Sequence, residues 1–148
     1  MDSTRLTQKL DALGPAALAI LRVMTGLLFM QHGFQKLFHW PPGGHHTGPL
    51  ELLSMVGIAG ILEFFGGFLV AIGLFTRPVA FLLSGQMAVA YFAIHLASNL
   101  SKPWGYIPVV NSGDLAILYC FIFFLFVFTG PGPFSVDQAR ARTSQPLE

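Results

Sequence analysis

The sequence has few charges for its length. Asp, Glu, Lys and Arg make up 10% of its 148 residues, compared with roughly 25% in soluble domains. Its formal net charge is +1, so it has neither the basic surface typical of nucleic-acid-binding proteins nor a strongly acidic one. The scarcity of charge argues against an ordinary soluble domain, and we expect no nucleic-acid partner.

The sequence also lacks thiol pairs and nucleotide-binding motifs. Cys120 is the only cysteine, so the chain forms neither an intrachain disulfide nor a CxxC redox pair. The sequence contains no P-loop, no GxGxxG fingerprint and no G-x-S-x-G nucleophile motif. Any dithiol chemistry must therefore come from another chain.

Long apolar stretches are what the sequence does contain. Hydrophobic residues make up 53% of the chain. A membrane-spanning helix needs a stretch of about 20 residues that are mostly apolar. Turn-forming residues separate four such stretches, at about 15–38, 50–75, 78–98 and 113–129. We predict an all-α integral membrane protein, a four-helix antiparallel bundle forming a single domain over residues 1–148. Pro15 is expected to open the first helix, and residues 136–148 are expected to form a polar tail.

Basic residues at the ends of these stretches predict the orientation. Five lie on one side, namely Arg5, Lys9, Arg77, Arg140 and Arg142, and only Lys36 and Lys102 lie on the other. The positive-inside rule therefore places both termini in the cytoplasm of a multi-pass protein. The first apolar run is too long for a cleaved signal peptide, so we expect it to remain as an anchor.

Ionisable residues inside the apolar stretches are the candidate functional residues, because such groups are costly in a bilayer unless they are partnered. On the first span, Arg22, Gly26, Gly33 and Lys36 share one helical face, with His32 to one side. Glycines on that face allow close helix packing, so we expect it to point into the protein. Alternatively, Lys36 extends to the interface with water.

Glu63 lies near the middle of the second span and shares a face with Gly60 and Gly67. A carboxyl group at that depth must be protonated or paired. It is therefore a structural ion pair, a proton-transfer or ligand-binding group, or a neutral hydrogen-bonded acid. Depth along the helices separates it from Arg22 and favours His32, through a bridging water or ligand.

A second polar group is predicted near the outer ends of the spans. Tyr91 and His95 share a face of the third span, and Asn111 and Asp114 precede and open the fourth. In an antiparallel bundle these residues would lie above Glu63 in a pocket open to the outside. The alternative is that Ser112 and Asp114 only cap the fourth helix.

The histidines give little support for a metal site. His32 and His95 are at similar depth, so bis-histidine haem ligation is conceivable. His39, His45 and His46 lie in a Gly- and Pro-containing loop without the spacing of a zinc site. We predict no metal and no intrinsic cofactor.

The order of these motifs resembles the DoxX family of small four-helix membrane proteins of bacteria and archaea. The resemblance rests on Arg22, Gly26, His32-Gly33, Lys36-Leu37, Glu63, Gly66-Gly67, Gly73-Leu74, Thr76-Arg77, Asn111, Gly113-Asp114, Gly130-Pro131-Gly132 and Ser135-Val136-Asp137. Asp114 stands where the family usually has glutamate. Aspartate carries the same charge, but its side chain is shorter.

The resemblance implies a loose association with quinone-linked sulfur oxidation or redox homeostasis. We therefore expect an inner-membrane subunit in which Glu63 and His32 exchange protons with a quinone, and a partner protein or a homo-oligomer completes the system. The residues expected to bind the quinone are Arg22, Lys36, Tyr91, His95, Asn111 and Asp114. The alternatives are a non-catalytic scaffold, or a proton-coupled transporter of small solutes in which Glu63 is the coupling carboxylate.

Overall fold

A computed structural model describes residues 3–42 and 51–144, and all the regular secondary structure in these ranges is helical. The elements are α1 (Ser3–Phe38), α2 (Met55–Ile72), α3 (Thr76–Val89), the π-helix η1 (Ala90–Leu96), the 3₁₀-helix η2 (Ala97–Asn99), α4 (Pro108–Asn111), α5 (Asp114–Thr129) and α6 (Val136–Thr143). The prediction of an all-α protein is confirmed.

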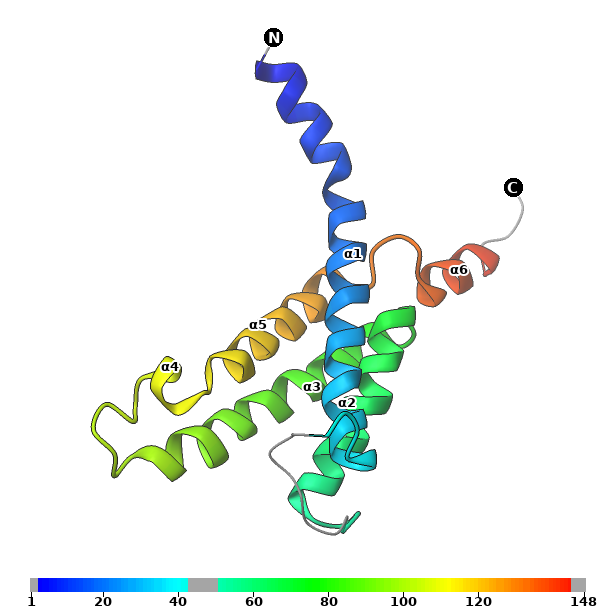
Figure 1. The fold of residues 1–148 in the computed structure, drawn as a ribbon. Coiled ribbons are helices and arrows are strands. Elements are labelled where there is room, and N and C mark those ends of the chain that lie inside the picture. The colour runs from blue at the N-terminus through cyan, green and yellow to red at the C-terminus, as the bar shows by residue number, and fades with distance from the viewer. Residues whose placement is uncertain (1–2, 43–50, 145–148) are drawn as a thin grey trace.

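The long helices pack as two pairs. α1 lies against α2, and α3 lies against α5 (Figure 1). The short Gly73–Phe75 connection joins α2 to α3 and so links the pairs, which cross at an angle and diverge towards one end (Figure 1). This arrangement is more open than the compact four-helix bundle expected from the sequence, which stays a prediction.

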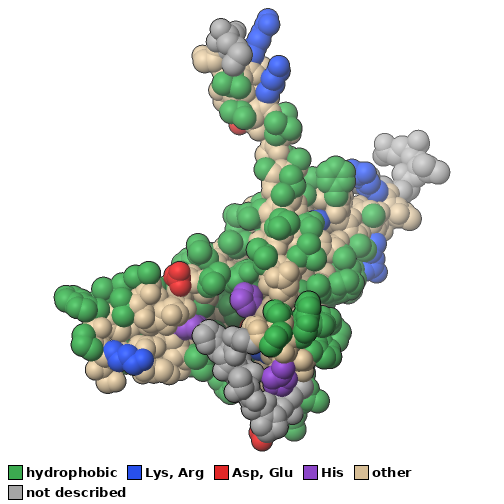
Figure 2. Space-filling model, viewed as in Figure 1, with side chains coloured by type: hydrophobic (Ala, Val, Ile, Leu, Met, Phe, Trp, Pro, Cys, Tyr) green, Lys and Arg blue, Asp and Glu red, His purple; other side chains and the backbone are tan. Residues whose placement is uncertain are grey.

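In the part of the chain that the structure describes, three helical segments are long and apolar enough to cross a membrane: Ser3–Phe38, Met55–Ile72 and Thr76–Asn99. α5 is also apolar but has only 16 residues, about 24 Å at 1.5 Å per residue. Large apolar side chains such as Ile20, Phe81 and Phe121 are exposed. Hydrophobic side chains cover much of the surface in Figure 2. Such an apolar exterior is typical of a protein whose solvent is lipid.

Glycines set the close approach of α1 and α2. A Cβ atom on Gly33 would lie 2.6 Å from the carbonyl oxygen of Gly60, and one on Gly26 would lie 2.6 Å from the carbonyl oxygen of Gly67. No side chain fits at these distances, so the two backbones are in direct contact. The face of α1 that carries Arg22, Gly26 and Gly33 is buried, as expected from the sequence.

An aromatic cluster connects α1 to α5. The ring of Phe29 lies 5.0 Å from Tyr119 and 4.8 Å from Phe123, between centroids. Phe29, Phe123 and Leu83 of α3 are almost completely buried. Apolar burial of this kind, together with dispersion contacts, fixes the crossing of the two helix pairs.

The first helix begins earlier than expected. α1 starts at Ser3 and continues through Pro15, which was expected to open it. The preceding residues include Leu, Gln, Lys and Ala, all strong helix formers, so helical geometry is favoured on both sides of the proline. Residues 3–14 project beyond the packed helices (Figure 1).

Within the predicted polar C-terminal tail, residues 136–143 form the helix α6, which was not expected from the sequence. The side chain of Ser135 accepts a hydrogen bond from the backbone nitrogen of Gln138 at 3.2 Å and so caps this helix. The two carboxylate oxygens of Asp137 accept hydrogen bonds from the backbone nitrogens of Phe75 and Thr76, each at 2.9 Å. Asp137 therefore caps α3 from a distant part of the chain, which local sequence patterns do not reveal.

Ser112 does not cap α5, contrary to the alternative considered for it. It adopts a left-handed conformation with φ of 58°, and the N-cap of α5 is Gly113, without a side-chain hydrogen bond. Asp114 occupies the first turn, as expected. The side-chain oxygen of Asn111 instead accepts a hydrogen bond from the backbone nitrogen of Gly113 at 2.9 Å.

The glycine interface gives a first prediction. Gly33→Ala places a methyl group against backbone atoms of α2, so we expect a loss of about 1–3 kcal/mol from overpacking. Gly85→Ala is the matched control, because no atom lies within 4 Å of its Cβ position and alanine favours the helix. Thermal unfolding of the purified protein in lipid nanodiscs measures both. Equal melting temperatures for the two variants would contradict direct backbone contact between α1 and α2.

The Asp137 cap gives a second prediction. Burial alone would raise the pKa of Asp137, but hydrogen bonds from Thr76 and Phe75 and the nearby charge of Arg140 outweigh it and lower that pKa. The ionised cap therefore stabilises the fold fully above the ordinary Asp pKa of about 3.9, and this stabilisation is lost as the pH falls through the lower folded value. We expect Asp137→Ala to cost about 1 kcal/mol at pH 7.

The pH dependence separates this cap from a general packing effect. The difference in melting temperature between wild type and Asp137→Ala should shrink as the pH falls below about 4. A difference that stayed constant down to the acid limit of the measurement would show that the charge of Asp137 is not what stabilises α3.

Candidate functional site

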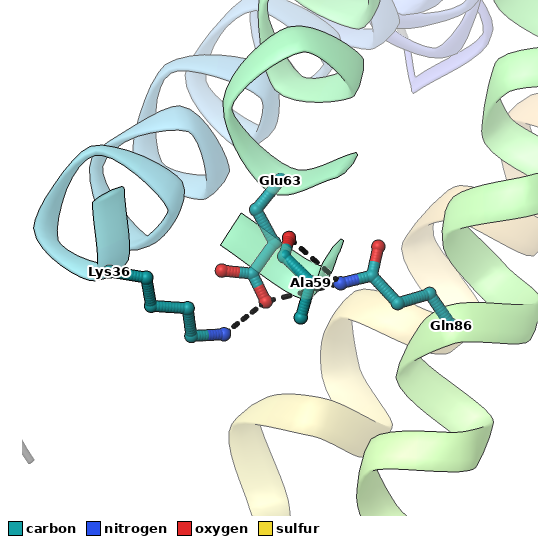
Figure 3. Close-up of polar contacts among 4 residues, drawn as sticks. All are labelled: Lys36, Ala59, Glu63 and Gln86. Atoms are coloured by element: carbon teal, nitrogen blue, oxygen red, sulfur yellow. Dashed lines mark hydrogen bonds and ion pairs between the residues drawn. The ribbon is translucent and has the colours of Figure 1, made fainter. Parts of the chain in front are cut away.

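The candidate site is centred on Glu63 of α2, which is 2% exposed. Its Oε1 atom forms an ion pair with the ammonium group of Lys36 from α1. Gln86 of α3 donates from Nε2 to the same Oε1 at 3.2 Å and to the carbonyl oxygen of Ala59 at 3.4 Å (Figure 3). Three helices thus meet at one carboxylate oxygen.

Close helix packing explains why Lys36 reaches Glu63. Gly33 and Gly60 allow α1 and α2 to touch, and a Cβ on Gly60 would lie 3.1 Å from the Cβ of Lys36. The lysine side chain is 24% exposed, whereas that of Glu63 is 3% exposed. Lys36 therefore turns inward to the acid and does not extend away from it, which decides between the two alternatives for this residue.

Two buried acceptor atoms at the site have no hydrogen-bond partner among the described residues. They are Oε2 of Glu63 and Oε1 of Gln86. Leaving a buried polar atom unpaired costs about 1–3 kcal/mol, and more for a charged group. Unpaired acceptors at a buried ion pair are therefore a feature that a hydrogen-bond-donating ligand would satisfy.

His32 makes no direct hydrogen bond to Glu63 among the described residues, and a bridge between them through a water or ligand stays a prediction. Its side chain is exposed on α1, and its ring packs edge-on against Tyr119 of α5, with 6.0 Å between centroids. Lys36 is the direct partner of Glu63 because the longer side chain extends across the glycine contact. His32 lies within electrostatic reach of Lys36, so it borders the site without entering the ion pair.

Arg22 belongs to a different part of the protein. It is completely buried, and it donates to the carbonyl oxygens of Pro131 and Phe134, the second at 2.8 Å. Arg22 thus holds the turn between α5 and α6 against α1. Among the described residues, these hydrogen bonds join Arg22 to the turn before α6 and not to Glu63.

The residues expected at the outer mouth form a second cluster. Nδ1 of His95 lies 3.2 Å from the carbonyl oxygen of Asn111. The buried Asn111 donates to the carbonyl oxygen of Gly105 at 3.0 Å. The ring of Tyr91 packs against Gly113, and Asp114 is exposed nearby in the first turn of α5. Among the described residues, no hydrogen bond joins this outer cluster to Glu63.

A hollow separates the two helix pairs. Figure 2 shows the surface hollowed between the α1–α2 pair and the α3–α5 pair, with histidine side chains on its border. Tyr91 and His95 lie on the π-helix η1, a wide-turned geometry that occurs frequently at functional sites. The simple 3.6-residue period used to align these residues therefore does not describe this segment.

Two residues near Glu63, Gln86 and Tyr119, were not predicted from the sequence to belong to the site. Gln86 is an uncharged polar residue in an apolar stretch, and its amide was a signal of the same kind as the carboxyl group of Glu63. Tyr119 is buried in the aromatic cluster and lies within electrostatic reach of Glu63. Its tyrosine hydroxyl in an otherwise apolar α5 was the available signal.

No group of three or more His, Cys, Asp or Glu side chains in residues 3–42 and 51–144 is arranged to hold a metal ion. His45 and His46 lie outside the described residues. The described chemistry of the site is therefore that of hydrogen bonds and one ion pair.

The ion pair gives a third prediction. Lys36→Met leaves the buried carboxylate without its cation, so we expect a loss of about 3–5 kcal/mol in stability. Adding Glu63→Gln removes the unpaired charge and should recover much of this loss, which a double-mutant cycle in nanodiscs measures. Lys9→Met is the control on the same helix, because Lys9 is exposed. If Lys36→Met lowered the stability no more than Lys9→Met does, the ion pair would not contribute to the stability of the protein.

Comparison with known proteins finds a family model and relatives that match this chain. The DoxX family model matches residues 17–96. An uncharacterized protein of Haemophilus influenzae is 38% identical over 86% of this chain and 93% of its own length. An uncharacterized membrane protein of Mycobacterium tuberculosis is 29% identical over 90% of this chain and 86% of its own.

A third relative, the inner membrane protein YqjF of Escherichia coli, is 26% identical over 88% of this chain and 95% of its own length. No solved structure matches the chain. The family match covers more than half of the chain and includes both Lys36 and Glu63. With its apolar helices and its buried ion pair, the chain belongs to the DoxX family of membrane proteins.

Proposed function

We propose that the protein is the membrane subunit of a quinone-linked redox system and that it binds quinone beside Glu63, with electrons supplied by a partner protein. The observation that carries this proposal is the unpaired Oε2 of Glu63, buried between membrane helices next to an ammonium group. We place the chain in the inner membrane, with both termini in the cytoplasm.

The residues present fit a quinone. When bound, a quinone supplies reversible two-electron, two-proton chemistry. The Lys36 ammonium has three N–H donors, so it can contact Glu63 and still donate to a ligand oxygen. Oε2 of Glu63 accepts a hydrogen bond from a ligand hydroxyl.

Proton transfer is assigned to two side chains. Glu63 accepts a proton from the ligand at Oε2, and His32 exchanges it with water at the exposed border of the site. Tyr91, His95, Asn111 and Asp114 are assigned to the outer mouth. Arg22 is not assigned to the ligand, because its guanidinium group is bound to the turn that precedes α6.

The scaffold alternative receives less support from the structure. It uses the glycine faces to grip other proteins, but Gly26, Gly33 and Gly67 contact the opposite helix of the same chain. These faces are therefore already occupied. The transporter alternative uses the same Glu63 and differs from our proposal in its measurable outcome, since proteoliposomes would then show solute or proton flux.

A binding experiment tests the proposal. Protein purified with native lipid is extracted with solvent, bound quinone is identified by mass spectrometry, and a short-chain quinone analogue is titrated into wild type and Glu63→Gln. We expect at least a tenfold weaker affinity in Glu63→Gln, since hydrogen bonds to charged groups contribute about 1.5–3 kcal/mol. Ser84→Ala is the control, because Ser84 bonds to Cys120 and not to the site.

The opposite results are equally clear. Absence of both co-purified quinone and analogue binding, or identical affinity in wild type and Glu63→Gln, would remove the proposed function.

A further inference from the structure

The amide of Gln86 directs its donor nitrogen to acceptors of the protein. Nε2 donates to the carbonyl oxygen of Ala59 and to Oε1 of Glu63 (Figure 3). Both partners are acceptors, so turning the amide over would set its oxygen against two other oxygens. The orientation of Gln86 is therefore fixed, and its Oε1 atom always presents an acceptor.

Only one of the two carboxylate oxygens of Glu63 accepts hydrogen bonds from the described residues. Lys36 and Gln86 both donate to Oε1 of Glu63, whereas Oε2 has no partner among the described residues (Figure 3). An ion-paired carboxylate has acceptors and no donors. The two buried atoms left for a ligand, one on Glu63 and one on Gln86, are thus both acceptors. The Lys36 side chain is 24% exposed, so water can satisfy its remaining donors when no ligand does.

We infer that the site binds the reduced, dihydroxy form of its quinone more tightly than the oxidised form. A quinol hydroxyl donates a hydrogen bond to an unpaired acceptor, whereas a quinone carbonyl is itself an acceptor and would leave that atom unpaired. The difference corresponds to one hydrogen bond to a charged group in a buried site, so we expect a preference of at least tenfold. This inference rests on the proposed function.

Such a preference has a redox consequence. Tighter binding of the reduced form makes the bound quinone easier to reduce than the free quinone. Each tenfold preference raises the midpoint potential of a two-electron couple by about 30 mV. By raising this midpoint potential, the acceptors on Glu63 and Gln86 would favour electron transfer from the partner protein to the bound quinone.

The test compares both redox forms of one analogue. Full-length protein in nanodiscs is titrated anaerobically with a short-chain quinone and, separately, with its dithionite-reduced quinol, and the two dissociation constants are measured by calorimetry. We expect the quinol to bind at least tenfold more tightly to wild type and to Ser84→Ala. Glu63→Gln brings an amide N–H donor to the same place, so its preference for quinol should fall to about threefold or less.

The outcomes separate this inference from the proposed function. Equal affinities, or tighter binding of the quinone, in wild type would overturn the inference and leave the quinone site standing. A preference that persisted unchanged in Glu63→Gln and in Gln86→Met would also overturn it, because the acceptors on these two side chains would not be its source. If neither the quinone nor the quinol bound, both this inference and the proposed function would be overturned.

Discussion

A carboxylate buried between membrane helices must find a cation, and this requirement organises the centre of the protein. Lys36 reaches Glu63 only because α1 and α2 touch at glycines, where a single methyl group would meet backbone atoms. The glycine contact and the ion pair are therefore interdependent. The contact brings the charges together, and the ion pair makes the buried position of Glu63 tolerable.

Arg22 connects the other end of α1 to the C-terminal segment through hydrogen bonds. It neutralises backbone carbonyl dipoles of the turn that follows α5, while Asp137 on α6 satisfies the free N–H groups at the start of α3. Together these contacts tie α1, α3 and the C-terminal segment at one end of the protein. Arg22 and Lys36 both point inward from α1. Arg22 stabilises the C-terminal turn, whereas Lys36 forms the ion pair of the candidate site.

The sequence predicted what depends on local periodicity and on the cost of polar groups in lipid. The apolar spans, the buried face around Gly26 and Gly33, and the need for a partner at Glu63 all follow from these two rules. These rules did not predict that Lys36 is the partner of Glu63. The depth estimate ignores how far a lysine side chain reaches across a glycine contact. The cap from Asp137 and the π-helix around Tyr91 depend on distant contacts and on backbone geometry, which period-based reasoning does not contain.

The position of Gln86 gives the site its connection to the rest of the fold. α1 and α2 form one pair and α3 and α5 the other, and Gln86 is the side chain through which the second pair reaches Glu63. A ligand that bonded to Oε1 of Gln86 and Oε2 of Glu63 would add a link between pairs that already meet through the packing of α2 against α3 and through the aromatic cluster. If a ligand binds as proposed, its binding would therefore depend on how the two helix pairs are arranged.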